Sequence, residues 1–142
     1  YYAGKAAQEE AYAAGPVPLT LAHTTAWFSL AETFLSQIRI GPVAVVPGLR
    51  LQPVHPCAAA EFVADAVESG PASGSPPRVE VRQLAGSEVM DAAAMARAVA
   101  SARHPGVRVV RLPLPMSGPR EGLLPEAHVS TDPRTFDDWL TS

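Results

Sequence analysis

The feature that most constrains the fold of this chain is the alternation of helix-prone and strand-prone segments, which are separated by proline and glycine. Helix-forming composition or helical spacing predicts helices at residues 1–14, 26–38, 56–70, 87–104 and 132–140. Apolar β-prone runs predict strands at 17–23, 78–86 and 106–114, and a small hairpin at 41–54 that turns at Pro47-Gly48. Alternating strands and helices favour an α/β fold with a parallel sheet.

Only about three of these segments have the pattern of clear sheet strands. A parallel sheet normally has helices on both faces and contains more strands than that. We therefore expect these strands to belong to a larger sheet, part of which lies outside this sequence. The alternative is that the 142 residues form a complete small protein.

Local signals predict where several helices begin. Pro56 suits the first turn of its helix. Ser87 is the candidate N-cap of the following helix, with Asp91 as an acid in the first turn. Asp132 is the candidate N-cap of the last helix. The apolar residues of that helix share one face and should dock onto the body: Phe136, Trp139 and Leu140.

Composition limits the classes of partner. Hydrophobic residues make up 47% of the chain and charged residues 18%, which is typical of one globular domain with a core. A net charge of −3 argues against nucleic acid and anionic membranes, because both require a basic face. No apolar run reaches the roughly 18 residues of a membrane span. The single cysteine excludes an internal disulfide, and we expect a cytoplasmic protein.

Five stretches occur in an order that resembles a known family: "YYAGKAAQEEAYAAGPVPLTLAHTTAWF", "LQPVHPCAAAEFVADAV", "VRQLAGSEVMDAAAMARAV", "PLP" and "TFDDWL". Together they resemble the C-terminal half of NmrA-like, atypical short-chain dehydrogenase/reductases, which are NAD(P)-binding Rossmann proteins. The resemblance implies that residues 1–142 are the C-terminal part of one Rossmann-type domain with flanking helices. It implies a substrate-side region at about 26–56 and 87–142. It also implies that the first βαβ units and their glycine-rich phosphate-binding turn precede Tyr1.

The first residues contain a candidate catalytic pair. Tyr1 and Lys5 are four apart, so they share a helix face and can point into one cleft. An ammonium near a phenol lowers the phenol's pKa, so such a tyrosine can exchange a proton with a carbonyl or hydroxyl. The resemblance implies that Lys5 also binds the nicotinamide ribose of NAD(P). The spacing alone is equally typical of an exposed helix start, and Tyr2 competes for the role of Tyr1.

The loop "AHTTAWF" follows the first predicted strand. Ligands bind at the carboxyl ends of strands in open α/β sheets, so Thr24 and Thr25 are candidate cofactor contacts. For the same reason His23, Trp27 and Phe28 are candidates for the substrate pocket. The family often has an Arg-Pro-Thr sequence here, from which His23 and Thr24 depart. Ordinary loop and core packing is the alternative for all five residues.

The remaining reactive residues predict no further site. Cys57 at a helix N-terminus would be reactive if its pKa were lowered, but a buried, inert thiol is the favoured interpretation. The adjacent acids Glu9 and Glu10 point apart on a helix and are expected to be solvated. No histidine has zinc-like spacing to another ligand, so we predict no metal site. The histidines are His23, His55, His104 and His128.

Three functions are compatible with these patterns. The resemblance favours an NAD(P)-dependent oxidoreductase that acts on a small carbonyl, alcohol or quinone. The first alternative is a non-catalytic NAD(P)-sensing protein that binds partner proteins. The second is an α/β body without a cofactor, stabilised when its open sheet edge pairs with another chain. That chain would be a second copy in a homodimer or the expected N-terminal half.

Overall fold

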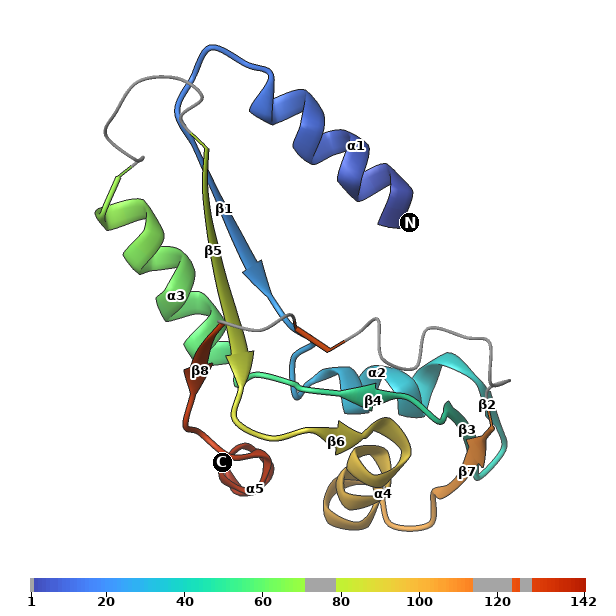
Figure 1. Cartoon of the computed structure of the whole chain (residues 1–142). Helices are drawn as coiled ribbons and strands as arrows, with labels where there is room; N and C mark the ends of the chain where they lie inside the picture. The colour runs from blue at the N-terminus through green and yellow to red at the C-terminus, as the bar shows by residue number, and fades with distance from the viewer. Residues whose placement is uncertain (1, 71–78, 114–123, 126–128) are drawn as a thin grey trace.

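The protein is described by a computed structural model that covers residues 2–70, 79–113, 124–125 and 129–142. Its main sheet has three parallel strands in the order β1-β5-β8, with β1 at one edge. These strands are β1 (Leu19–Thr24), β5 (Val79–Gly86) and β8 (Ser130–Asp132). Helices α1 (Tyr2–Ala13) and α3 (Pro56–Glu68) flank the long strands on opposite sides (Figure 1). The chain is therefore mixed α/β with a parallel sheet, as the alternation of segments predicts.

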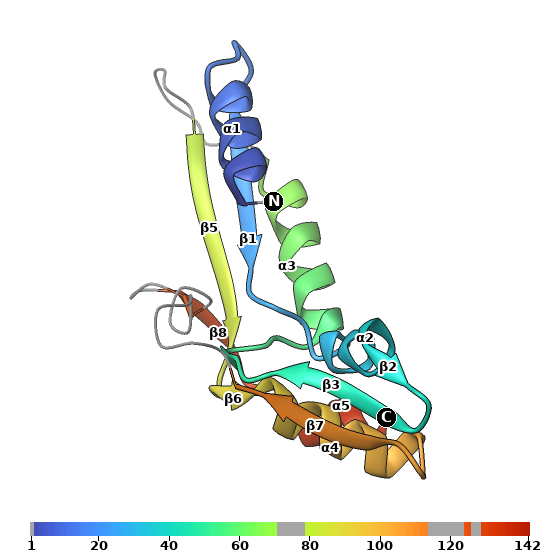
Figure 2. The ribbon, with the colours of Figure 1, turned by 90° about the vertical axis from the view of Figure 1, so that its right-hand side faces the viewer.

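A smaller β region lies beyond the carboxyl ends of β1 and β5 (Figure 2). In it β3 pairs antiparallel with β2 and parallel with β7, while β4 pairs antiparallel with β6. Helices α2 (Leu30–Gln37) and α4 (Ala92–Arg103) pack against β3. The strands are β2 (Arg39–Ile40), β3 (Val43–Pro47), β4 (Arg50–Leu51), β6 (Met90–Asp91) and β7 (Arg108–Leu112).

The predicted hairpin at Pro47-Gly48 is wrong. Strands β3 and β4 pair with β7 and β6 and not with each other. Ala44 and Val46 on β3 are fully buried, which requires a central strand covered on that face. The hairpin that does form joins β2 to β3 through Gly41, whose φ of 58° is in the left-handed region that favours glycine.

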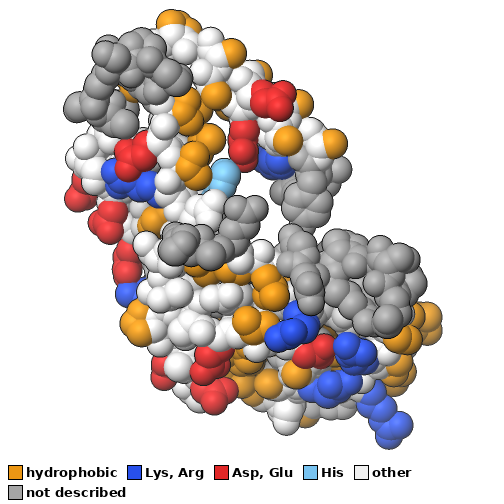
Figure 3. All heavy atoms as spheres, in the orientation of Figure 1, with side chains coloured by type: hydrophobic (Ala, Val, Ile, Leu, Met, Phe, Trp, Pro, Cys, Tyr) orange, Lys and Arg blue, Asp and Glu red, His pale blue; other side chains and the backbone are white. Residues whose placement is uncertain are grey.

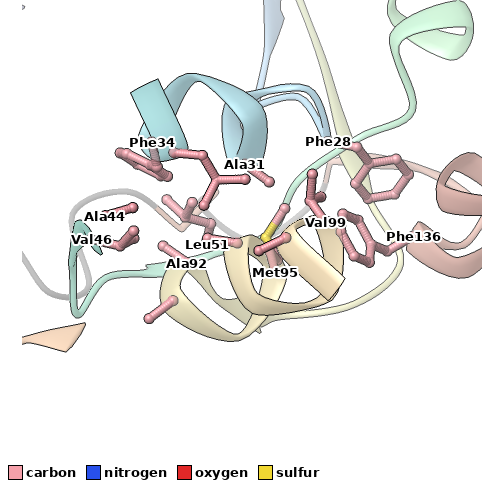
Figure 4. Packing of buried hydrophobic residues seen from close by; sticks show 14 of the residues in the cluster. Phe28, Ala31, Phe34, Ala44, Val46, Leu51, Ala92, Met95, Val99 and Phe136 are labelled. Carbon is pink, nitrogen blue, oxygen red and sulfur yellow. The ribbon is translucent and has the colours of Figure 1, made fainter. Parts of the chain in front are cut away.

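The main hydrophobic core fills the space between β3 and helices α2, α4 and α5 (Phe136–Thr141) (Figure 4). Met95 and Val99 on α4 are fully buried in this cluster. The prediction that the last helix docks is confirmed, because Phe136 and Trp139 are buried against Phe28. The buried members of the cluster all come from 28–51 and 92–139, which lie within the ranges assigned above to the substrate side. A substrate role for that region stays a prediction.

The helix starts follow the local signals only in part. Helix α3 begins at Pro56 as predicted, and Nδ1 of His55 accepts a hydrogen bond from the Cys57 amide at 3.1 Å. The prediction that Ser87 caps α4 is wrong, because the chain forms strand β6 before the helix begins. The Asp91 carboxylate caps α4 instead, and it accepts a hydrogen bond from the Ala94 amide. A hydrogen bond donated by the third helical amide to the side-chain oxygen of the cap is the usual geometry of this position.

The last helix begins later than predicted. Asp132 is not its cap, because this residue ends the unpredicted strand β8 and is buried there with 7% exposure. Thr135 caps α5 in a capping box with Asp138, in which each side chain accepts from the other residue's backbone amide. The prediction of a buried Cys57 is also wrong: α3 buries Ala58, Ala59 and Ala66, and Cys57 is exposed.

Candidate functional site

A pocket lies at the carboxyl ends of β1 and β5, where the sequence predicts ligand contacts. Its volume is about 220 Å³, below the roughly 300–1,000 Å³ of a pocket for a drug-sized ligand. The pocket therefore suits a small molecule or one end of a larger one. It is lined by His23, Thr24, Thr25, Gln83, Leu84, Pro125 and Val129. Three of these residues, His23, Thr24 and Thr25, are among those predicted.

Sheet register fixes the loop that leaves β1. Thr24 is paired with Leu84 in the parallel ladder, and the Thr25 amide donates to the Leu84 carbonyl at 3.1 Å. The Thr25 hydroxyl donates to the carbonyl of Gln52 at 2.6 Å, and the Gln52 amide donates to the Gly86 carbonyl at 2.7 Å. The Thr25 hydroxyl proton is thus used within the protein and holds the loop to its neighbours.

Gly86 permits a close approach at the end of β5. A Cβ atom built on Gly86 would lie 1.8 Å from the carbonyl oxygen of Pro53, which no real contact allows. The segment after Pro53 is held in turn by the Val54 amide, which donates to the Ala26 carbonyl at 2.8 Å. Only glycine at this position lets the two backbones meet beside the pocket.

Thr24 keeps a proton that a ligand can accept. The indole Nε1–H of Trp27 donates to the Thr24 hydroxyl oxygen at 3.0 Å. A hydroxyl that accepts one hydrogen bond still has its own proton to donate. Trp27 is 48% exposed and does not line the cavity itself, so the structure places it as the partner of a pocket residue.

The side chain of His23 on β1 contacts helix α1, which packs against this strand. Its Nε2 lies 3.1 Å from Oε1 of Glu9, and the two side chains are 39% and 42% exposed. Glu9 is thus partly solvated, as expected, although its carboxylate also contacts the imidazole, and Glu10 is exposed as expected. Figure 3 shows that this face of the molecule is hollowed between α1 and the lower body, with a histidine side chain in the hollow.

Other predicted residues lie apart from the pocket. The Lys5 ammonium is exposed and donates to the Gln8 amide oxygen at 3.4 Å. Helix α1 runs antiparallel to β1, so its N-terminal end, which carries Lys5, lies toward the carboxyl end of that strand (Figure 1). Tyr1 lies outside the described residues. Phe28 is placed in the core and not in the pocket, because its ring packs edge-to-face against Phe136 with ring centroids 5.4 Å apart.

Sequence reasoning missed the remaining lining residues, among them Gln83, and it missed Glu9 beside the pocket. Gln83 lies near the carboxyl end of β5. The rule that ligands bind at the carboxyl ends of strands was applied to β1 alone, and it would have pointed to Gln83 if it had also been applied to β5. Glu9 has no such signal, because its contact with His23 spans 14 positions and depends on how α1 packs.

A second hollow is larger, at about 360 Å³, and lies between α4 and β7. It adjoins the amino end of β7 and the C-terminal end of α4, where backbone carbonyls repel anions. It is lined by Arg97, Ala100, Ser101, Pro105, Gly106, Val107 and Val109. Ligands of open α/β sheets bind at the carboxyl ends of the strands, and this hollow lies at an amino end. We therefore take the smaller pocket, at the carboxyl ends of β1 and β5, as the candidate site.

Within the described part of the chain, no three His, Cys, Asp or Glu residues come together as metal ligands, and the absence of a metal stays a prediction. None of the described helices is both long and apolar enough to cross a bilayer. Comparisons with family models, with curated proteins and with solved structures found no match to this chain.

Proposed function

We propose that this chain forms the substrate-side part of an NAD(P)-dependent oxidoreductase that acts on a small carbonyl, alcohol or quinone. The observation that carries the proposal is the pocket at the carboxyl ends of two parallel strands, lined by the consecutive polar residues His23, Thr24 and Thr25. Ligands of open α/β sheets bind at such ends. The ordered resemblance to NmrA-like, atypical short-chain dehydrogenase/reductases supports the same function.

The pocket fits the reacting end of a nicotinamide or a small substrate. His23 and Thr24 both line the cavity, and the Thr24 hydroxyl keeps a proton that it can donate. At about 220 Å³ the cavity does not hold a whole dinucleotide. The 142 residues contain no GxGxxG-type turn for the pyrophosphate. The proposal therefore requires a phosphate cradle from residues outside 1–142 or from another chain.

The proposal gives defined tasks to residues of the pocket and of the segments around it. A bound nicotinamide would supply hydride transfer to or from the substrate carbon. The Thr24 hydroxyl would donate to a carbonyl or carboxamide oxygen in the pocket, while Trp27 orients that hydroxyl. Thr25 acts as a structural tie through the Gln52 carbonyl. Lys5 would bind the nicotinamide ribose and Tyr1 would be the acid–base group, as the resemblance implies.

The second candidate is a non-catalytic NAD(P)-binding sensor. Two hydrogen bonds favour it: the Lys5 ammonium donates to Gln8, and the Thr25 hydroxyl donates to the Gln52 carbonyl. Among the described residues that line the pocket, His23 is the one titratable side chain. A protein that binds the cofactor and turns over no carbonyl, alcohol or quinone would be this sensor.

Cofactor binding by the full encoded protein, including any residues before Tyr1, tests the proposal. Saturation at about 100 times Kd should stabilise the fold by about 2.7 kcal/mol and raise the melting temperature by several degrees. NADH and NADPH are each added, and oxidation of the cofactor is followed with a panel of aldehydes, ketones and quinones. Absence of stabilisation by both cofactors would contradict the proposal.

Replacing Thr24 by valine keeps the side-chain shape and removes the hydroxyl. We expect Thr24→Val to lower kcat/KM by about 10-fold to 150-fold, because a hydrogen bond to a developing charge is worth about 1.5–3 kcal/mol. Thr33→Val is the matched control, since Thr33 is exposed on α2 and is not among the residues that line the pocket. Equal activities of the two variants would remove Thr24 from the site.

A further inference from the structure

We propose that the outer edge of β7 is a docking surface for an extended acidic segment of another protein, which would pair with β7 as an additional strand. The smaller β region has the strand order β2-β3-β7, so β7 lies at its edge. Among the described residues, β3 is the one strand that pairs with β7 (Figure 2). A strand at the edge of a sheet offers unpaired backbone groups to another chain.

The pairing with β3 determines which backbone groups of β7 point outward. The Arg108 amide donates to the Pro42 carbonyl at 2.7 Å, so Arg108 directs its backbone groups toward β3. Successive residues of a strand direct their amides and carbonyls to alternate sides. Val109 and Arg111 therefore direct theirs away from β3. No described strand lies on that side, so these groups can pair with an added strand.

The side chains of β7 give an added strand apolar contacts on both of its faces. Val110 and Leu112 are 50% and 47% exposed. Val109 points to the opposite face of the sheet, because it is the register partner of the buried Ala44. There it lines the hollow of about 360 Å³ between α4 and β7, together with Val107. An added strand would place alternate side chains beside Val110 and in this hollow.

The charge of this region determines which kind of strand is attracted. Residues 33–60 and 92–113, which include β2, β3, β4, α4 and β7, contain neither aspartate nor glutamate, although the whole chain has 14 acidic residues. The two ranges contain six arginines: Arg39, Arg50, Arg97, Arg103, Arg108 and Arg111. Two of them form ion pairs with acids just outside these ranges. Within the described chain, Arg108 on β7 and Arg97 beside the hollow have no acidic partner.

Figure 3 shows several Lys and Arg side chains close together on this part of the molecule. Such a surface attracts an acidic strand and opposes a second copy of this chain. Pairing β7 with the β7 of another copy would bring Arg108 and Arg111 beside the same residues, and like charges on neighbouring strands are destabilising. A nucleic acid is attracted by arginine but has no peptide groups to pair with the edge. The open edge, the apolar hollow and the arginines together favour an acidic peptide strand.

Binding is tested on the isotope-labelled full encoded protein with an acetylated peptide in which valine alternates with glutamate and threonine. The control peptide has lysine in place of glutamate. We expect the acidic peptide to bind about fivefold or more tightly than the control, and less tightly at high salt. The amides of Val109 and Arg111 should shift and become protected from hydrogen exchange, because they donate to the added strand. Equal binding of the two peptides, or no protection of these amides, would overturn the proposal.

Charge reversal at the edge tests the partner's charge. We expect Arg108→Glu to weaken binding of the acidic peptide by about 2-fold to 30-fold, because an opposite-charge pair becomes a like-charge pair. The same variant should prefer the lysine peptide, which a folding defect would not cause. Arg50→Glu is the matched control, since Arg50 is exposed on β4, which pairs with β6 and not with β7. A wild-type preference in Arg108→Glu, or the same reversal in Arg50→Glu, would contradict docking at β7.

Two other anions distinguish a peptide site from a general anion-binding surface. A short oligothymidylate and phosphatidylserine vesicles are each added to the wild type and to Arg108→Glu. Tighter binding of either one than of the acidic peptide, with loss in Arg108→Glu, would overturn the proposal. None of these measurements requires NADH or NADPH, so the docking surface and the proposed function stand or fail separately.

Discussion

Replacing Gly86 by alanine should disrupt the backbone contact that supports the pocket. The new Cβ would lie 1.8 Å from the Pro53 carbonyl oxygen and 2.8 Å from its carbonyl carbon. Ordinary carbon–oxygen contacts are about 3.3 Å or longer, so the two backbones must separate by roughly 1.5 Å. Both clashing atoms belong to the backbone, which cannot rotate away as a side chain would.

The size of the effect follows from what that separation breaks. The hydrogen bond of 2.7 Å from Gln52 to the Gly86 carbonyl would be lost, at about 1 kcal/mol. Forcing an extra methyl into a packed site costs about 1–3 kcal/mol. We therefore expect Gly86→Ala to lower the free energy of unfolding by about 2–4 kcal/mol. For a chain of this length the melting temperature should fall by about 10 °C.

Urea denaturation followed by circular dichroism measures this change directly. Gly4→Ala is the matched control, because Gly4 lies in α1 with nothing within 4 Å of a built Cβ. The control should be neutral or stabilise the helix by up to about 1 kcal/mol. A Gly86→Ala protein as stable as the wild type would refute the close approach of β5 to Pro53, and with it the described shape of the pocket.

Two further predictions concern α5 and the core it covers. Hydrogen bonds from Thr135 lower the pKa of Asp138 below its unfolded value of 3.8. The ionised carboxylate therefore stabilises the fold at pH values above 3.8, and this stabilisation is lost as the pH falls through the lower pKa of the folded state. The stability difference between wild type and Asp138→Asn, measured by urea denaturation, should therefore be largest at neutral pH and shrink in acid; a difference independent of pH would contradict the cap. Phe28→Ala should cost about 3–5 kcal/mol because Phe28 is 3% exposed, whereas Val67→Ala, at a site 75% exposed, should cost under about 0.5 kcal/mol. Equal losses in the two variants would contradict the core position of Phe28.

Local signals in the sequence predict the elements whose structure is set locally. Helix α3 begins at Pro56 because proline suits the first turn, and the parallel pair of β1 and β5 lies in the two most clearly β-prone runs. The strand-end rule singles out His23, Thr24 and Thr25, and all three line one pocket, while their contacts with a cofactor or substrate stay predictions. These features depend on neighbouring residues or on a general property of parallel sheets.

Features that depend on tertiary contacts were not predictable in this way. Strand β8 has three residues and lacks an apolar alternation, so only its pairing with β5 defines it. Strand β3 pairs with the distant β7, which overrides the turn signal at Pro47-Gly48. Glu9 reaches His23 only because of the angle at which α1 lies on the sheet.

The most direct test of the proposed site is to map where NADPH and NADH change the backbone amide resonances of the full encoded protein. We predict the largest changes at Thr24, Thr25 and Gln83, which line the pocket at the strand ends. Little change is expected at Ser101 and Val109 beside the other hollow. Changes concentrated at Ser101 and Val109, or no change at Thr24 and Gln83 with either cofactor, would contradict the assignment.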